Sequence, residues 1–118
     1  MVNIPESHQE LLNSSIAVTM ATTMPNNTPQ TTVLWFIWDG DAVKISTTRG
    51  RQKTENIEKN PKVSLMFIDP QNIYKYLEIR GTVEISDEGA YDFIDQVTKK
   101  YTGKDSYYGN MAPAEAKE

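Results

Sequence analysis

The chain has 118 residues, a formal net charge of −4 and a hydrophobic fraction of 38%. This composition is typical of a soluble folded domain and excludes a disordered chain or one made of membrane helices. The length is enough for one domain and short for two, so we expect a single domain over residues 1–118.

Two residue counts exclude several kinds of site. The sequence has no cysteine, which excludes disulfides, thiolate catalysis and cysteine-based metal sites. It has one histidine, His8, which excludes a histidine-rich metal centre, and we expect no bound metal. The N-terminus lacks the cationic and apolar stretches of a signal peptide, so we expect a cytoplasmic protein.

The N-terminal segments read as a helix followed by a strand. Pro5 suits a first helical position, and the apolar spacing that follows predicts a helix over residues 5–13. In the segment SSIAVTMATT, Ile16, Val18 and Met20 alternate with smaller residues, which is typical of a strand. The next segment, MPNNTP, is a turn.

The run QTTVLWFIWDGDAVKIST, residues 30–47, predicts a hairpin that turns at Asp39-Gly40. Its first arm, residues 31–38, is apolar on both faces. One face carries Val33, Trp35 and Ile37, and the other carries Leu34, Phe36 and Trp38. A strand of this kind is covered on both sides, so one face requires a second layer, a second subunit or a flat ligand.

Two further helices are expected. One covers residues 48–60 and is stopped by Pro61, and the other covers residues 87–101 with Asp87 as its N-cap. The apolar stripe of the last helix is formed by Tyr91, Ile94, Val97 and Tyr101.

Two strands separate these helices, over residues 62–69 and 74–86. In the second strand, alternation places four side chains on one face, and Gly81 is expected to mark an irregularity. These four residues are Tyr74, Tyr76, Glu78 and Arg80. Hairpin connections between neighbouring strands predict an α+β fold with an antiparallel sheet, closed or half-closed as a barrel.

The stretch TTRGRQKTEN, residues 47–56, contains cations where a helix is expected to begin. The helix dipole disfavours Arg49, Arg51 and Lys53 there unless an anion is bound. Free backbone N–H groups together with such side chains form a phosphate site. We expect Arg51 to grip the phosphate as a fork and Lys53 to act as a point charge. The neighbouring hydroxyl donors and the position of close approach are Thr47, Thr48 and Gly50.

Each of these features also has an ordinary explanation. The cations could form a solvated face of a surface helix, Trp35 could pack in a core or dimer interface, and Tyr74 with Tyr76 could be a packing pair. Taken together, they favour a phosphate-bearing aromatic cofactor or nucleotide bound to a small barrel. No catalytic acid or base is identified, which fits a cofactor that carries the chemistry. The acidic net charge argues against a nucleic-acid binder.

Three segments, ATTMPNNTPQTTVLWFIWDGD, ISTTRGRQKTENIEKNPKVSLMFIDP and YLEIRGTVEI, resemble the pyridoxamine-phosphate-oxidase-like superfamily over roughly residues 8–105. The similarity is to its flavin and deazaflavin (coenzyme F-420) oxidoreductases. This resemblance implies an antiparallel split β-barrel, FMN-binding-like, with flanking helices. It also implies a homodimer with cofactor sites at the subunit interface, and no nucleic-acid or membrane partner.

The resemblance also implies the cofactor-binding residues. Arg51 and Lys53 match the phosphate-binding pair, and Tyr74 and Tyr76 match positions where the partner subunit presents aromatic side chains. The other positions implied are Val33, Leu34 and Trp35 beside the ring system, and Ser46, Thr47, Arg49, Gln52 and Asn56 near the phosphate.

We therefore expect an oxidoreductase that transfers a hydride between F-420 and a small organic acceptor. There are two alternatives. One is an FMN-dependent enzyme of the same fold, and the other is a non-catalytic protein that binds flavin, deazaflavin or haem. Nothing matches the substrate-binding residues of true pyridoxamine phosphate oxidases, so that activity is not expected. The sequence leaves open the choice of cofactor, the acceptor and the way the barrel is completed after the final helix.

Overall fold

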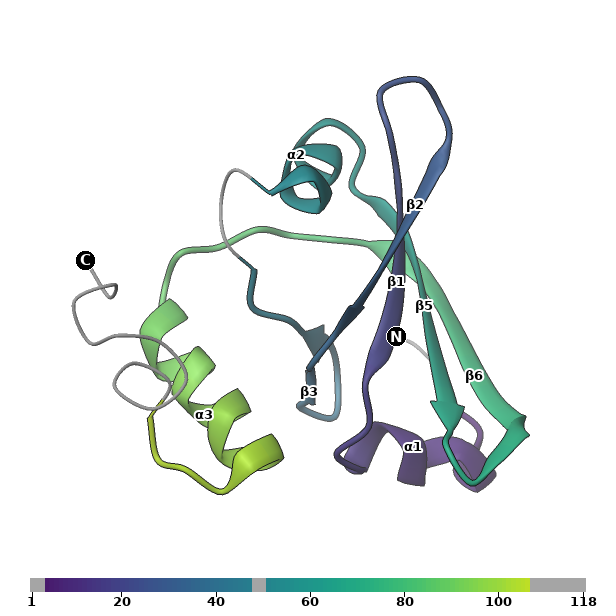
Figure 1. The fold of residues 1–118 in the computed structure, drawn as a ribbon, viewed down its shortest axis with the longest axis vertical. Coiled ribbons are helices and arrows are strands. Elements are labelled where there is room, and N and C mark those ends of the chain that lie inside the picture. Colours follow the sequence, from purple (N-terminus) through teal and green to yellow (C-terminus); the bar gives the residue numbers. More distant parts are fainter. Residues whose placement is uncertain (1–3, 48–50, 107–118) are drawn as a thin grey trace. The chain divides into compact units, whose positions relative to one another are not determined.

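The computed structural model describes residues 4–47 and 51–106 (Figure 1). The chain divides into two units, Met1–Ile85 and Ser86–Glu118. Each unit is described by itself. The first unit holds η1 (Glu6–His8), α1 (Gln9–Asn13), β1 (Val18–Thr23), β2 (Pro29–Leu34), β3 (Ile37–Trp38), β4 (Val43–Lys44), α2 (Gln52–Lys59), β5 (Lys62–Asp69) and β6 (Asn72–Thr82). The second unit holds α3 (Ala90–Thr102). Among the described helices, none has the length and apolarity needed to cross a membrane.

Four strands of the first unit form an antiparallel sheet in the order β2-β1-β5-β6, and β3 pairs with β4 in a small second sheet. Strands β2 and β6 therefore lie at opposite edges of the larger sheet. In its central row, Val18 of β1 lies opposite both Leu34 of β2 and Phe67 of β5. The expected antiparallel α+β architecture is confirmed.

The hydrophobic core lies on one face of the larger sheet. Val18 and Met20 alternate inward from β1, as the sequence predicts, and are both buried. Phe36 and Phe67 meet edge to face with ring centroids 4.9 Å apart, a geometry that aromatic pairs prefer. The helices contribute Leu11 and Leu12 from α1 and Ile57 from α2.

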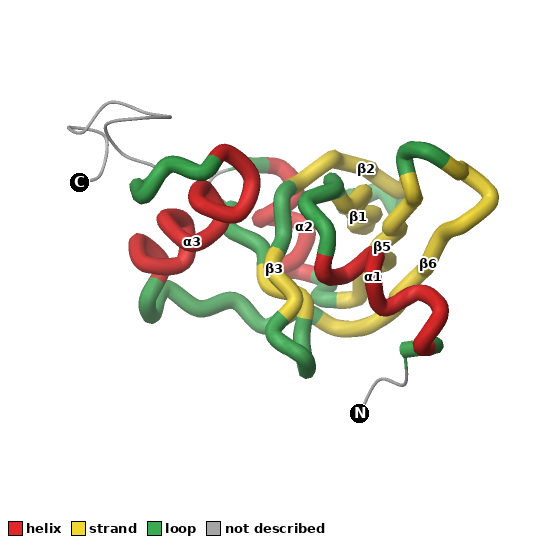
Figure 2. The backbone as a smooth tube through the Cα atoms, turned by 90° about the horizontal axis from the view of Figure 1, so that it is seen from below, coloured by secondary structure: helices red, strands yellow, loops and turns green. Residues whose placement is uncertain are grey.

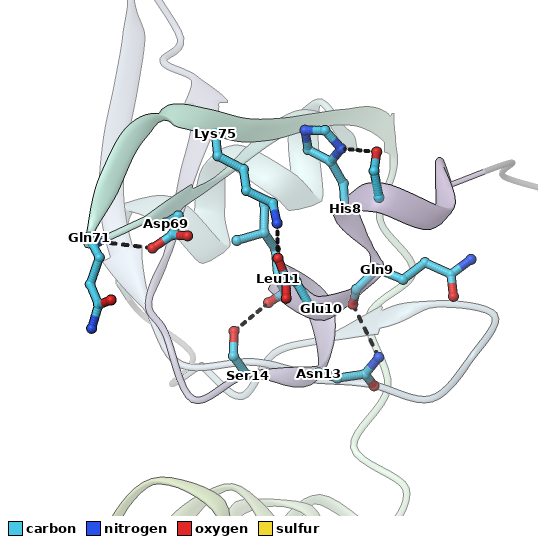
Figure 3. Close-up of polar contacts among 10 residues, drawn as sticks. His8, Gln9, Glu10, Leu11, Asn13, Ser14, Asp69, Gln71 and Lys75 are labelled. Atoms are coloured by element: carbon cyan, nitrogen blue, oxygen red, sulfur yellow. Dashed lines mark hydrogen bonds and ion pairs between the residues drawn. The ribbon is translucent and has the colours of Figure 1, made fainter.

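Helix α1 closes one end of this core. It contacts β3 and β5 and, seen from below in Figure 2, lies in front of the strands. Figure 3 shows how it is held to β6: the Lys75 ammonium points at the Glu10 carboxylate and forms an ion pair with it. The predicted helix over residues 5–13 is therefore present, as a 3₁₀ turn followed by a short α-helix.

The predicted strand over residues 31–38 is interrupted, and this is the main correction to the sequence analysis. The chain leaves the larger sheet after Leu34, and the hairpin at Asp39-Gly40 involves β3 and β4 instead of one long arm. The two-sided apolar pattern explains the break. By leaving the sheet between β2 and β3, the chain inserts Phe36 fully into the core.

The boundaries of the two later helices also differ from the prediction. Helix α2 begins at Gln52, and Arg51 is its N-cap. Thr48, Arg49 and Gly50 lie outside the described residues. Helix α3 begins at Ala90, with Gly89 as its N-cap at a φ of 70° in place of Asp87. A glycine adopts this left-handed conformation readily, so it can end the preceding turn there.

The long strand β6 has the predicted faces but a different irregularity. Tyr74, Tyr76, Glu78 and Arg80 are exposed, while the residues between them are half-buried. Pairing is regular through Gly81, which lies opposite Val63, and the register shifts instead between Ile68 and Asp69. The irregularity predicted at Gly81 is therefore wrong: the shift adjoins the turn that joins β5 to β6.

Candidate functional site

The start of α2 places two cations next to each other. Arg51 has an extended backbone conformation as N-cap, and its side chain makes no capping hydrogen bond. Lys53 is the second residue of the helix and is only 9% exposed. The first N–H groups of a helix have no partner within it. The helix therefore begins with two positive side chains and with N–H groups that its own turns do not satisfy.

Lys53 has an unusual environment for a buried lysine. Burial lowers the pKa of its ammonium group below the ordinary value of 10.5, and the nearby Arg51 guanidinium lowers this pKa further. Within residues 4–47 and 51–106, no acidic side chain forms an ion pair with Lys53. Buried charges are normally paired. A bound phosphate would provide the missing negative charge, so these residues fit the phosphate of a cofactor.

The loop before α2 is tied to the helix by two threonines. The Thr47 and Thr54 hydroxyls are 3.1 Å apart and hydrogen-bonded, and Thr54 is buried. Ser46, just before them, is half-buried. The loop therefore reaches α2 through a hydrogen bond between side chains.

Further along α2, the Asn56 side chain is buried in a polar network. Its amide nitrogen donates to the Thr22 hydroxyl at 3.0 Å and to the Gln30 side-chain oxygen at 3.2 Å. The same nitrogen lies 3.3 Å from the Met24 sulfur. The Asn56 oxygen accepts from the Gln52 amide at 2.8 Å.

Sequence reasoning missed Thr22, Met24 and Gln30. One signal was present, because alternation in β1 puts Thr22 on the same inward face as Val18 and Met20. A polar residue at an inward position requires a partner, but nothing in the sequence identifies that partner as residue 56.

The remaining predicted site residues lie on or next to the larger sheet. Val33 is 68% exposed on its outer face, Leu34 points toward the core, and Trp35 follows β2 at 37% exposed. Tyr74 and Tyr76 are on the outer face of β6, 87% and 54% exposed. Arg49 lies outside the described residues.

The sheet order keeps the β6 tyrosines away from Val33 within one subunit. Strands β2 and β6 are separated by β1 and β5, so the sheet places three steps of about 4.8 Å between them. The structure thus brings Arg51, Gln52, Lys53 and Asn56 together on α2, and it leaves Tyr74 and Tyr76 at the opposite edge of the sheet.

Two surface depressions accompany these elements. One, of about 270 Å³, lies between the β1–β2 turn and the end of α2 and includes Met24, Asn56 and Lys59. The other, of about 550 Å³, lies over the ends of the four sheet strands and includes Lys62 and Arg80. Neither is lined by Arg51 or Lys53. Among the described residues, no group of three or more acidic or histidine side chains could hold a metal ion.

Residues 4–117 match the family described as pyridoxamine 5′-phosphate oxidase. The chain belongs to the pyridoxamine 5′-phosphate oxidase family. A solved structure described as an F420 reductase is 38% identical, with a TM-score of 0.80, and the alignment covers 86% of this chain and 81% of that one. The split β-barrel expected from the sequence is confirmed.

Other members of the pyridoxamine 5′-phosphate oxidase fold are more distant. A conserved hypothetical protein from Mycobacterium tuberculosis is 24% identical, with a TM-score of 0.72, covering 93% of this chain and 70% of that one. The haem storage protein HutZ from Vibrio cholerae is 18% identical, with a TM-score of 0.64, and the alignment covers 85% of this chain and 77% of that one. At these identities the likeness shows the fold alone. No curated protein matches the sequence.

Proposed function

We propose that this protein is an oxidoreductase that uses the deazaflavin coenzyme F-420 to transfer a hydride to a small organic acceptor. The observation that carries the proposal is Lys53, a residue only 9% exposed that lies beside Arg51 and has no acidic partner among the described residues. The 38% identity to an F420 reductase supports the choice of cofactor.

The protein's own contribution is binding and orientation. The cofactor, when bound, supplies the hydride from its ring system, so the reaction requires no general base from the chain. Arg51 binds the phosphate as a fork and Lys53 as a point charge, at the N-terminus of α2. The exposed end of β2, with Val33 and Trp35, provides an apolar surface for the ring system.

The proposed active form is a homodimer with cofactor sites between the subunits. The outer face of the sheet carries Val33, Ile68 and Tyr76 as exposed apolar side chains, and monomeric proteins rarely leave such a surface uncovered. Tyr74 and Tyr76 are at the sheet edge opposite to Val33. They are therefore suited to contact the cofactor of the second subunit.

FMN is the alternative cofactor, because it carries the same kind of planar ring and phosphate on a ribityl chain. The site at Arg51 and Lys53 would hold either phosphate. Titration of the purified protein with F-420 and with FMN, read by fluorescence, distinguishes the two. Oxidation of the reduced cofactor by a panel of acceptors then separates an enzyme from a carrier, since a carrier accelerates none of them above the uncatalysed rate.

The phosphate site is tested by Lys53→Met, which keeps an unbranched side chain and removes the charge. We expect the dissociation constant for the preferred cofactor to rise roughly 10- to 100-fold, the loss typical of a charge-assisted contact. Lys59→Met is the matched control, because it removes the same charge from the exposed last turn of the same helix. For this control we expect the dissociation constant for the cofactor to rise about twofold or less.

Two results would contradict the proposal. One is an affinity of Lys53→Met equal to that of the wild type. The other is equal binding of FMN and riboflavin by the wild type, because riboflavin lacks the phosphate.

A further inference from the structure

Asn56 uses all of its side-chain polar atoms inside the protein. Its nitrogen donates to Thr22 on β1 and to Gln30 on β2, and its oxygen accepts from Gln52. The side chain is 1% exposed. A group satisfied in this way gains little from contacting a ligand directly. Its effect on a ligand must pass through the elements that it joins.

Thr22 closes the network between the two strands. Its hydroxyl accepts the hydrogen bond from Asn56 and donates to the Gln30 oxygen at 3.4 Å. Thr22 is 3% exposed, so an unpaired group there has no water to replace a lost partner. Buried polar groups of this kind are costly when one member is removed and fix a unique geometry when all are satisfied.

One end of the network lies at the start of α2 and the other lies on β2, where Gln30 faces the core side of the sheet and Val33 faces the outer side. Gln52 is between Arg51 and Lys53 at the start of α2. Gln30 is on β2, three residues before Val33. Helix α2 also contacts β1 directly. The network therefore fixes the start of the phosphate-binding helix relative to the strand proposed to flank the ring system.

We infer that Thr22, Gln30 and Asn56 are positioning residues that set the distance between the phosphate grip on α2 and the ring-binding end of β2. The inference rests on the proposed function, because it assumes that Arg51 and Lys53 bind a cofactor phosphate. It assigns a role to Thr22 and Gln30, which make no predicted contact with the cofactor. It also predicts that Asn56 acts through α2 without touching the ligand.

The test compares a phosphate-bearing ligand with its phosphate-free analogue. FMN and riboflavin share the ring and ribityl chain and differ only in the phosphate, so the ratio of their dissociation constants measures the phosphate grip. Thr22→Val replaces the hydroxyl with a methyl group of similar size, and Thr22→Ser retains the hydroxyl. Both variants are titrated with both ligands, and their unfolding is measured in urea.

For Thr22→Val we expect the FMN dissociation constant to rise about tenfold and that of riboflavin to change by less than about twofold. Thr22→Ser should restore the wild-type ratio. A variant that is only less stable would weaken both ligands together, so a change in the ratio separates positioning from a loss of fold. If Thr22→Val does not fold, Gln30→Met removes the other acceptor from a half-buried position and is tested in the same way.

Two outcomes overturn the inference when the wild type binds FMN much more tightly than riboflavin. In one, the variants keep this preference unchanged, and in the other they bind both ligands more weakly by the same factor. A wild type that binds FMN and riboflavin equally tightly would instead contradict the phosphate site of the proposed function. The two failures are therefore distinguishable in one set of titrations.

Discussion

Under the proposed function, Lys53 would favour ligand binding at the expense of the stability of the free protein. Partial desolvation and the neighbouring Arg51 guanidinium both lower the pKa of Lys53 and so disfavour its charged form. Functional sites often contain groups whose environment lowers stability until the ligand arrives. The unfavourable positive charge of Lys53 is therefore consistent with a site that binds an anion.

This reasoning predicts that Lys53→Met stabilises the protein without ligand. At pH 7 the substitution removes this charge, and we expect the free energy of unfolding to increase by less than about 1 kcal/mol, because solvent screens part of the unfavourable interaction. The pKa of Lys53 is lower in the folded state than in the unfolded state, so the unfolded state binds more protons between that lowered pKa and 10.5. Wild-type stability must rise with pH through this window.

Urea unfolding at pH 7 and near pH 10 measures both the stability gained by Lys53→Met and the rise of wild-type stability with pH. The advantage of Lys53→Met should be largest at pH 7 and should shrink as the wild-type lysine loses its proton. Cofactor affinity of the wild type should fall over the same pH range, because neutral Lys53 no longer attracts the phosphate. A variant less stable than the wild type at pH 7 would show that Lys53 is paired in solution.

The cations at the start of α2 were predictable because they are local in the sequence. Arg51 and Lys53 follow a strand and lie at the start of a helix, and their interpretation depends only on where that helix begins. Thr22 differs in this respect. Its partner is 34 positions away along the chain, so its role depends on how α2 packs over β1, which a single sequence does not show.

At the scale of elements, the segment around Trp35 shows where periodicity fails. Apolar residues at 33–38 fit one continuous strand, yet the chain forms β2 and β3 in different sheets. Both arrangements bury apolar side chains, and the sequence pattern does not distinguish them. The hairpin turn was predictable because Asp39-Gly40 is a local signal, and Gly40 has the expected positive φ of 94°.

Two glycines provide a matched test of this backbone argument. A methyl group added at Gly40 or at Gly81 meets no atom within 4 Å, so neither substitution causes a clash. Of these two glycines, only Gly40 has a positive φ. We expect Gly40→Ala to lower the free energy of unfolding by about 1–2 kcal/mol through backbone strain. Gly81→Ala should be neutral or stabilising by up to about 1 kcal/mol.

Thermal or urea unfolding of both variants makes this comparison. Equal destabilisation by the two substitutions would contradict the argument and would indicate that Gly81 has a special backbone conformation after all. That result would also restore the irregularity that the sequence suggested at Gly81.

At the scale of the whole molecule, the outer face of the larger sheet remains to be explained. Its rows include Val33, Met66, Ile68 and Tyr76, in register across strands β2, β5 and β6. The doubly apolar pattern at residues 31–38 suggested a cover for one face, but that segment is divided between two sheets, and only Val33 of it lies on this outer face. Which residues form the exposed face became clear only from the strand register.

If a second copy of the chain covers this face, a charge placed in it should prevent association. Ile68→Lys adds an ammonium group on the outer face directly opposite Tyr76. We expect the dimer dissociation constant to rise at least about 30-fold, because burying an unpaired charge costs several kcal/mol before relaxation. Gln9→Lys makes the same change of net charge at an exposed position on α1 and should leave the dimer intact.

Sedimentation equilibrium measures the association, and cofactor titration of the same samples links it to the site. If Tyr74 and Tyr76 contact the cofactor of the other subunit, Ile68→Lys should weaken cofactor binding only at concentrations where the wild type is dimeric and the variant is not. A wild type that sediments as a monomer at tens of micromolar would contradict the proposed interface. So would an Ile68→Lys variant that remains dimeric, because a lysine at that position could not then be buried between subunits.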